Sequence, residues 1–214
     1  MGSAAATEVS SHALARDAVL DLAFEIRGSS LPVDHRHALR DAIMSTLACL
    51  EFEPAVAIHP LKSARGDDGA LLLSARSRLV LRVPATLHAA VAELSGRVLE
   101  IDDVQIGVGA STQRPLLAHG TVYAHLVTGD IDDELGFTAA MRNELEMLGI
   151  RGEVICGRRQ TIGAGDTLLR GFSVMVHGLA PEASLRLQAR GTGCDLKLGC
   201  GIFVPHRSAA AVGS

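Results

Sequence analysis

Two histidines with one residue between them, His35 and His37, stand in the segment LPVDHRHAL (31–39) and are the first candidates for chemistry. Histidine suits proton transfer at neutral pH because the unperturbed imidazole pKa is about 6.5. Side chains two residues apart on a helix point about 200° apart, so the pair is poorly placed to share a metal ion or one substrate atom. A frayed first helical turn would relax that restriction. The alternative is that His35 only begins a helix and has no further role.

The segment GTGCDLKLGCGIFVPH (191–206) is the second unusual stretch. Its glycines are Gly191, Gly193, Gly199 and Gly201. The segment lies between a predicted helix and a predicted strand, whereas the phosphate-binding loop of nucleotide-binding proteins follows a strand. Two interpretations stay open. The segment is a flexible connection that uses glycine for positive φ angles, or its backbone approaches a phosphodiester chain closely and Lys197 adds positive charge.

The four cysteines do not form a metal or redox motif. Cys49 and Cys156 fall in apolar runs and are expected to lie in the core. Cys194 and Cys200 are six residues apart with only His206 near them, so a zinc ion would lack a clear fourth ligand. No two cysteines are separated by two residues, which argues against a zinc ribbon or a thioredoxin-type pair. We expect no metal, no cofactor and the reduced thiols of a cytoplasmic protein.

The charge of the chain is distributed unevenly. The net charge of −4 by itself argues against a nucleic-acid-binding protein. Residues 1–150 contain 12 Lys and Arg against 20 Asp and Glu, whereas residues 151–214 contain 8 against 4. An anionic partner would therefore meet the C-terminal third first. The chain has no run of 18 apolar residues and no basic start followed by an apolar block, so neither a membrane span nor a secretory signal is expected.

Hydrophobic periodicity and turn signals divide the first half of the chain into alternating elements. We expect a disordered tail at 1–16 and a first domain at 17–110. Its predicted elements are a strand at 18–28, a helix at 32–50 with Asp34 as its N-cap, a short apolar strand at 55–61, a strand-rich stretch at 69–84, a helix at 84–96 and a strand at 97–110.

The same order of elements returns in a second domain, predicted at 115–207 after a hinge near 109–115. Its elements are a strand at 114–129, a helix at 130–150, a hairpin at 152–162 and 166–179, a helix at 180–191 and a last strand at 199–206. The order βαββαβ is that of the ferredoxin-like fold. The sequence therefore predicts an α+β protein of two tandem ferredoxin-like domains with a C-terminal glycine-rich loop.

The region GFSVMVHGLAPEASLRLQARGTGCDLKLGCGIFVPH (171–206) resembles the C-terminal signature of the CRISPR-associated endoribonucleases that process precursor CRISPR RNA. These enzymes belong to the RAMP superfamily, whose domains are RRM-like. The segments at 157–162 and 31–39 also resemble this family, in its Myxan-type branch. The likeness is dense over 150–207 and patchier over 18–130. It implies the same two ferredoxin-like domains, with a glycine-rich loop that helps to shape the RNA-binding surface.

The resemblance also implies the chemistry. In this family the ribose 2′-OH attacks the adjacent phosphate of a repeat RNA without a metal and leaves a 2′,3′-cyclic phosphate and a 5′-OH. Histidine suits the proton transfers and arginine or lysine the charge on phosphorus. Asp34-His35 matches the branch pattern, which makes His35 the first candidate catalytic residue. His37 stands where the branch tends to have an aromatic residue and is the second.

Basic residues near these segments are the candidate RNA contacts, because arginine forks suit phosphates and guanine edges. They are Arg36, Arg40, Arg158, Arg159, Arg190, Lys197 and Arg207. The chain has one Tyr, five Phe and no Trp. Few aromatic residues argue against a surface of stacked single-stranded bases and favour shape recognition of a repeat stem-loop.

Three functional hypotheses remain, in order. The first is an endoribonuclease of the cytoplasm that stays bound to the mature CRISPR RNA hairpin and joins other subunits of a type I effector complex, with no membrane and no direct DNA contact. The second is a non-cleaving RAMP-fold subunit that holds that RNA in the complex. The third is a structural ferredoxin-like protein with no RNA role.

Overall fold

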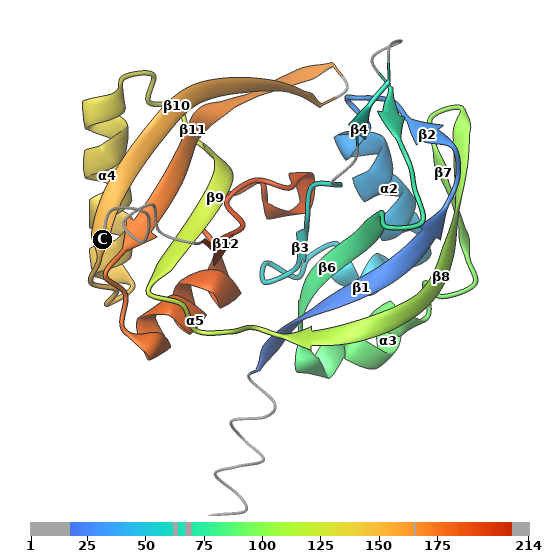
Figure 1. Cartoon of the computed structure of the whole chain (residues 1–214), viewed down its shortest axis with the longest axis horizontal. Coiled ribbons are helices and arrows are strands. Elements are labelled where there is room, and N and C mark those ends of the chain that lie inside the picture. The colour runs from blue at the N-terminus through green and yellow to red at the C-terminus, as the bar shows by residue number, and fades with distance from the viewer. Residues whose placement is uncertain (1–17, 62–63, 67–69, 165, 207–214) are drawn as a thin grey trace, which may run out of the picture.

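The structure is a computed structural model of the 214-residue chain and describes residues 18–61, 64–66, 70–164 and 166–206. The predicted tail at 1–16 and the candidate Arg207 lie outside the described residues. Two sheet-and-helix domains lie side by side (Figure 1), one built on a five-stranded sheet and the other on a four-stranded sheet. This arrangement confirms the predicted α+β fold of two tandem ferredoxin-like domains.

The N-terminal domain has an antiparallel sheet in the order β3-β6-β1-β8-β7, and a small sheet β2-β5-β4 beside it. Without β7 this is the ferredoxin-like order, in which an antiparallel strand separates the two strands of each βαβ unit. The elements are β1 (Val19–Arg27), β2 (Ser30–Leu31), α2 (Arg36–Thr46), η1 (Ala48–Leu50), β3 (Ala57–Ile58), β4 (Ala64–Arg65), β5 (Leu71–Leu72), β6 (Arg78–Pro84), η2 (Ala85–Leu87), α3 (His88–Ala92), β7 (Val98–Ile101) and β8 (Val104–Pro115).

The alternation of side chains along β1 and β6 decides which face of this sheet is covered. Leu22 and Phe24 of β1 are fully buried and pack with Leu81 of β6 and Ile43 of α2 in one hydrophobic core. Asp21 points to the opposite face. That face therefore has no helix of its own domain over it and is left for the other domain.

The helix predicted at 32–50 is shorter, because α2 covers Arg36–Thr46. The predicted N-cap, Asp34, is wrong: the N-cap is His35, and its side chain makes no capping hydrogen bond. The His35 N–H bonds to the Pro32 carbonyl, and His35 has φ −58° and ψ −4°. The preceding turn thus leads straight into the helix, and the extended conformation that a capping side chain needs does not occur.

The boundaries around the middle of the chain also differ from the prediction. β7 and β8 form a hairpin where one strand was expected at 97–110, and Asp102 in its turn has a positive φ of 50°. β8 continues to Pro115, so strand fills the stretch that was predicted as a hinge. The chain crosses to the second sheet through residues 116–120. Of the helix predicted at 84–96, only α3 and the short η2 form.

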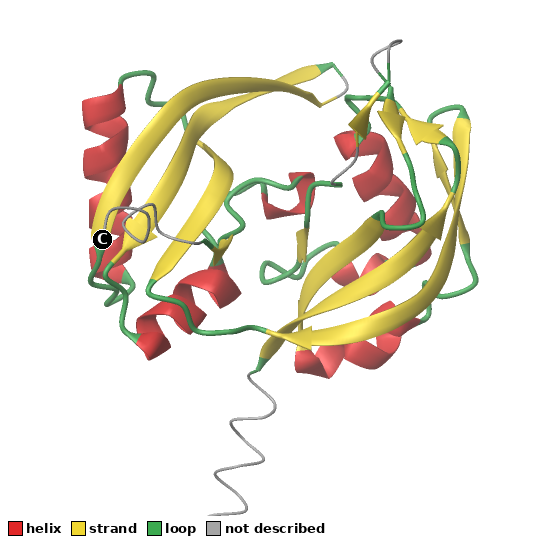
Figure 2. Ribbon diagram, viewed as in Figure 1, coloured by secondary structure: helices red, strands yellow, loops and turns green. Residues whose placement is uncertain are grey.

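The C-terminal domain has the complete ferredoxin-like order, β10-β11-β9-β12. Its helices α4 and α5 cover one face of this sheet (Figure 2). The strand predicted at 199–206 is reduced to two residues, because the glycine-rich segment before it is a loop. The elements are β9 (Thr121–Thr128), α4 (Glu134–Met147), β10 (Glu153–Ala164), β11 (Thr167–His177), α5 (Pro181–Arg190), η3 (Leu196–Leu198) and β12 (Val204–Pro205).

The alternation of side chains along β9 again decides which of them face away from the core of the domain. Val122 and Ala124 are fully buried and belong to the core that also holds Phe137 of α4. Tyr123 and His125 point to the other face. Both sheets therefore turn one uncovered face toward the centre of the molecule.

A buried arginine joins the domains. Arg82 of β6 is only 2% exposed, and its guanidinium binds Asp21 of β1 through two hydrogen bonds of 2.7 and 3.1 Å. The remaining Nη1 donates to the carbonyls of Gln188 and Phe203 in the C-terminal domain, each at 2.8 Å. Gln188 in turn donates to the carbonyl of Leu117 in the crossing segment. One side chain thus ties the first sheet to α5 and to the segment before β12.

Replacing Arg82 with methionine should lower the free energy of unfolding by about 3 kcal/mol, because a buried carboxylate and two buried carbonyls lose their partner. Urea unfolding followed by circular dichroism measures this loss. The matched control is Arg142→Met on the exposed side of α4, which should stay within about 0.5 kcal/mol of the unmodified protein. Equal stabilities of the two variants would contradict the role of Arg82.

The same network predicts a pH dependence of stability. Burial acts to raise the pKa of the Asp21 carboxyl, but hydrogen bonds from His59 and Arg82, with the Arg82 charge, outweigh it and hold this pKa well below its usual range. The stabilisation is therefore present above about pH 4, the pKa of an unfolded Asp, and is lost as the pH falls further. Asp21→Asn should flatten the decline in unfolding free energy between about pH 4 and pH 2. Urea unfolding of both proteins at stepped pH measures this decline. An equal decline in the unmodified protein and in Asp21→Asn would contradict the prediction.

Candidate functional site

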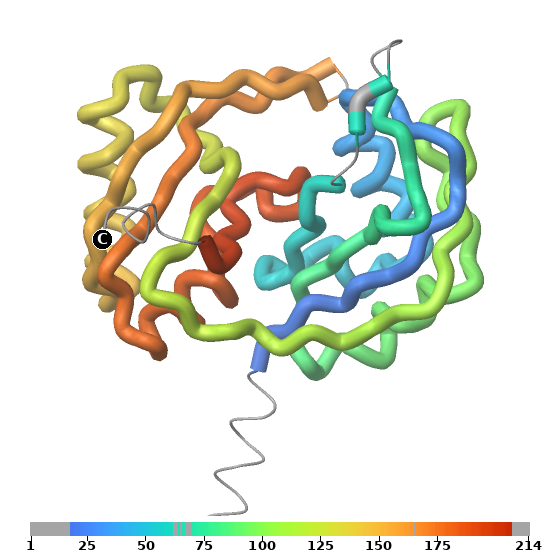
Figure 3. Tube along the Cα trace, in the orientation of Figure 1, coloured from blue at the N-terminus to red at the C-terminus, as the bar shows by residue number. Residues whose placement is uncertain are grey.

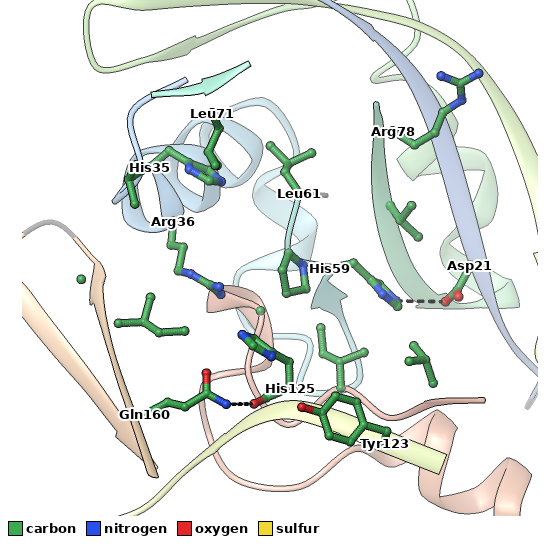
Figure 4. Close-up of a pocket in the computed structure, with 18 of the residues that line it drawn as sticks. Asp21, His35, Arg36, His59, Leu61, Leu71, Arg78, Tyr123, His125 and Gln160 are labelled. Atoms are coloured by element: carbon green, nitrogen blue, oxygen red, sulfur yellow. Dashed lines mark hydrogen bonds and ion pairs between the residues drawn. The ribbon is translucent and has the colours of Figure 1, made fainter. Parts of the chain in front are cut away.

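A cavity of about 1140 Å³ lies between the two domains and is called the interdomain cleft below. Its walls are the uncovered faces of both sheets, the start of α2 and part of the glycine-rich loop, and Figure 4 shows side chains that point into it. Among the described residues, four arginines and three histidines line it against one carboxylate, Asp21. This balance of charge suits an anionic ligand.

His35 lines the cleft from the N-terminal end of α2 and is 4% exposed. Its Nδ1 lies 2.7 Å from the carbonyl oxygen of Pro32. Because a carbonyl can only accept, Nδ1 carries the hydrogen, and Nε2 of the neutral ring is the proton acceptor. Burial lowers the pKa of His35 despite this bond, and the Arg36 charge lowers it further. His35 is therefore neutral at pH 7, which is the state of a general base.

Arg36 reaches from α2 to the C-terminal domain, where its Nη1 donates to the carbonyl of Leu198. Gly199 packs against the same guanidinium, since a Cβ on Gly199 would lie 2.6 Å from Arg36 Nη1. The middle residue of η3, Lys197, donates to the carbonyl of Glu51. The two predicted RNA contacts thus dock the glycine-rich loop on the N-terminal domain, although Arg36 also lines the cleft. Figure 3 shows this loop in the centre of the molecule, beside the segment with β3.

The glycines of this loop all have positive φ angles, between 66° and 78°. Gly201 is indispensable for the close packing, because a Cβ there would lie 1.8 Å from the carbonyl oxygen of Thr192. The Thr192 N–H closes the loop on the Gly201 carbonyl at 3.1 Å. Asp195 accepts a 2.6 Å hydrogen bond from the Thr128 hydroxyl of β9. The loop is held at both of its ends and on the second sheet. Its glycines have the positive φ angles that the first interpretation expected, and the approach of its backbone to RNA stays a prediction.

Three arginines that the sequence analysis did not single out line the cleft in the N-terminal domain. Arg78 lies on β6, Arg114 on β8, and Arg76 in the turn before β6. His59 also points into the cleft, with Nε2 3.4 Å from Asp21 Oδ1. The alternation of polar and apolar residues along β6 was a usable signal, but it does not tell which side chains face another domain.

Tyr123, His125 and Gln160 form the opposite wall. The Gln160 side-chain amide donates to the His125 carbonyl at 2.8 Å and links β10 to β9. Burial lowers the pKa of His125, and the Arg36 charge adds to this effect. His59 and His125 are cleft residues that the sequence analysis did not single out. Both lie in or beside apolar strands, whose pattern does not tell what the uncovered face of a sheet meets.

His37, the second candidate catalytic residue, is not among the residues that line the cleft. Its Nε2 is buried and has no hydrogen-bond partner among the described residues. Arg40, one helical turn after Arg36, is held in ion pairs with Glu51 at 2.8 Å and Asp41 at 3.1 Å. The structure therefore brings His35 and Arg36 to the cleft, but not His37 or Arg40.

The remaining candidate RNA contacts of the C-terminal domain lie on its outside. Arg158 and Arg159 are exposed on β10, next to a shift in register between Cys156 and Arg159. Arg159 forms an ion pair with Asp132. Arg190, the last residue of α5, is also exposed. None of these three arginines lines the cleft.

Within the described ranges, no group of three or more His, Cys, Asp or Glu side chains is arranged to hold a metal ion. No helix there has both the length and the apolar character to cross a membrane.

Comparison with known sequences gives two matches. The family model described as Cas6 Crispr matches residues 20–208. A curated relative, the CRISPR-associated endonuclease Cas6 of Myxococcus xanthus strain DK1622, is 32% identical over 196 residues, which are 91% of this chain and 85% of the relative.

Comparison with solved structures finds the same fold at low sequence identity. A CRISPR-associated protein Cas6 is 12% identical, with a TM-score of 0.66 over 88% of this chain and 100% of that one. A RAMP protein described as binding different RNA substrates is 15% identical, with a TM-score of 0.65 over 88% and 100%. A Cas6-related protein from Pyrococcus furiosus is 15% identical, with a TM-score of 0.63 over 86% and 97%.

Proposed function

The chain belongs to the Cas6 family, and from this premise we propose that it is an endoribonuclease that cuts CRISPR repeat RNA. A ribose 2′-OH attacks the adjacent phosphorus, the bond to the 5′-oxygen breaks, and the products carry a 2′,3′-cyclic phosphate and a 5′-OH. The name of the Myxococcus relative, an endonuclease, supports cleavage. The reaction needs a proton acceptor, a proton donor and positive charge near phosphorus, all of which side chains can supply without a metal.

The observation that carries this proposal is the state of His35 in the cleft. Its Nδ1–H is engaged by the Pro32 carbonyl, which fixes the ring and leaves Nε2 as the acceptor. Burial and the Arg36 charge keep the ring neutral at pH 7. A fixed, neutral imidazole beside an arginine is what removal of a proton from the 2′-OH requires. We assign His35 as the general base.

Positive charge for the phosphate comes from arginines of the N-terminal domain. Arg36 follows the proposed base directly, and Arg76, Arg78 and Arg114 lie across the cleft. Asp21 is the single carboxylate among the described lining residues, and Arg82 neutralises it. The cleft therefore attracts an RNA strand although the whole chain carries a net charge of −4.

The second proton carrier and the fate of the product stay proposals from the sequence. His37 stays the second catalytic candidate of the sequence, but its ring does not line the cleft in this structure. We also propose that the protein keeps the mature hairpin bound, with Arg158, Arg159 and Arg190 as outer contacts and Lys197 and Arg207 as further candidates, and that it joins other subunits of a type I effector complex. The RNA-binding description of the RAMP structural neighbour supports RNA as the ligand.

His35→Ala should slow single-turnover cleavage of the cognate repeat RNA, in excess EDTA, by about 10²- to 10⁴-fold, because it removes the general base. RNA affinity should stay close to that of the unmodified protein. In the unmodified protein, kcat/KM should fall at low pH with a midpoint below about 6.5, since His35 must lose its proton to act and its pKa is lowered.

The matched control is His88→Ala on α3, which is outside the cleft and should cut normally. Cleavage that survives in His35→Ala but is lost in His37→Ala would transfer the role of base to His37. A complete absence of cutting by the unmodified protein, with tight hairpin binding, would reject the enzyme and leave a non-cleaving RNA-binding subunit.

Arg76→Gln and Arg114→Gln should each weaken RNA binding and lower the slope of log affinity against log salt by about 1, because each removes one phosphate contact. Fluorescence anisotropy over a range of salt concentrations measures the slope. Arg142→Gln on α4 is the control with the same change of charge and should leave the slope unaltered. Slopes equal to that of the control would place the RNA outside the cleft.

A further inference from the structure

We propose that Arg36 and His125, which come from different domains, together bind one phosphate group of the RNA, and that His125 takes up a proton when this phosphate binds. The inference rests on the proposed function, because it takes RNA as the ligand of the cleft. It adds a subsite and a proton that the cleavage reaction does not require. No bond is made or broken in this step, and the proton comes from solvent.

The glycine-rich loop sets the distance between the two residues. On one side the Leu198 carbonyl accepts from Arg36, and on the other the Gly201 N–H donates to the carbonyl of Leu126 at 2.7 Å. Leu126 follows His125 directly on β9. The four residues from 198 to 201 therefore hold α2 and β9 at a fixed spacing, and Figure 4 shows the Arg36 side chain extending toward the His125 ring.

Both side chains keep donors for a ligand. The bond to Leu198 occupies one Nη1 hydrogen of Arg36, while a guanidinium has five N–H donors. His125 is exposed on its strand, and the Gln160 amide binds its backbone carbonyl rather than its ring. A phosphate oxygen between the two groups would accept from Arg36 and from a protonated His125. Gly199 leaves room for the Arg36 guanidinium, since a Cβ there would lie 2.6 Å from its Nη1.

The charges around His125 explain why the proton arrives with the ligand. Without a phosphate, burial and the Arg36 charge lower the pKa of His125, so the ring is neutral. β10 contributes Gln160, which carries no charge, and β9 itself contributes Tyr123. A phosphate neutralises Arg36 and adds a negative charge beside the ring, which reverses the sign of the local field and favours the imidazolium.

The glycine-rich loop contributes two further ionisable groups on this side. Burial raises the pKa of Cys200 to about 11, so its thiol stays uncharged. Asp195 is engaged by the Thr128 hydroxyl three residues further along β9. Neither group is placed to supply a proton to the ligand, so the uptake falls to His125.

The test is the pH dependence of RNA affinity, measured by fluorescence anisotropy at constant ionic strength. The probe is the cognate repeat RNA with a 2′-O-methyl group on every ribose, which has no 2′-OH to attack. In the unmodified protein, Kd should increase with increasing pH by up to about tenfold per pH unit. This slope applies between the His125 pKa of the free protein and that of the RNA complex, where binding takes up one proton. His125→Gln should lose this slope and bind about as weakly as the unmodified protein does at high pH.

His88→Gln is the matched control and should keep the slope. His35 also faces Arg36, but its titration contributes equally to the His125→Gln and His88→Gln proteins and cancels in their comparison. NMR of the histidine Cε1–H groups provides the second readout, in which the His125 pKa should rise on RNA binding. Arg36→Gln should weaken binding at every pH and raise the pKa of His125 in the free protein.

An unchanged slope in His125→Gln, or a His125 pKa that RNA does not move, would overturn the inference while cleavage still supports the proposed function. Proton-linked binding in a protein that does not cut would uphold the inference and reject the enzyme. The two failures are therefore distinguishable.

Discussion

The buried guanidinium of Arg82 is the contact on which the relation of the two domains depends. At 2% exposure it has lost its hydration, and such a loss is tolerated only when the donors find partners of good geometry. Asp21 supplies two of them from the same sheet, and the carbonyls of Gln188 and Phe203 supply the others from the second domain. If the domains moved apart, Arg82 would keep Asp21, but its Nη1 would lose both carbonyl acceptors. The cost of that state keeps the uncovered faces of the two sheets opposite each other, and the cleft is the space that remains between them.

The glycine-rich loop is a second constraint, and it acts on chemistry rather than on overall stability. Gly201 lies so close to Thr192 that only glycine fits, and Gly199 leaves room for the Arg36 guanidinium. The loop thus passes under the start of α2, where His35 lies, and along β9, where His125 lies. If a bound RNA displaced the loop, the positions of both His35 and His125 would change. This makes the loop a structural link between two walls of the cleft in addition to any contact that it makes with RNA.

The sequence predicted what local rules decide. The order of elements follows from hydrophobic periodicity, and the positive φ angles of the loop follow from its glycines. It failed where long-range packing decides. Asp34 was expected to cap a helix, but a turn at Pro32 sets the backbone of His35 and removes the need. His59 and His125 were not singled out, because a strand pattern says which side chains share a face but not what that face meets. Arg36 was expected as an RNA contact, and nothing in the sequence indicates that it also binds a loop 162 residues away in the chain.

The same arrangement explains how a chain with a net negative charge presents a positively charged cleft. A protein with a net charge of −4 is a poor RNA binder if its charges are evenly spread. Here Asp21 is the one acidic side chain among the described residues that line the cleft, and it is paired with Arg82 and His59. The Arg82 side chain that joins the domains thus also neutralises the one carboxylate among the described residues of the cleft. Stability and electrostatic attraction of RNA are set by the same two side chains, so Arg82 could not be exchanged for an apolar residue without exposing Asp21 to the phosphates that the cleft is proposed to bind.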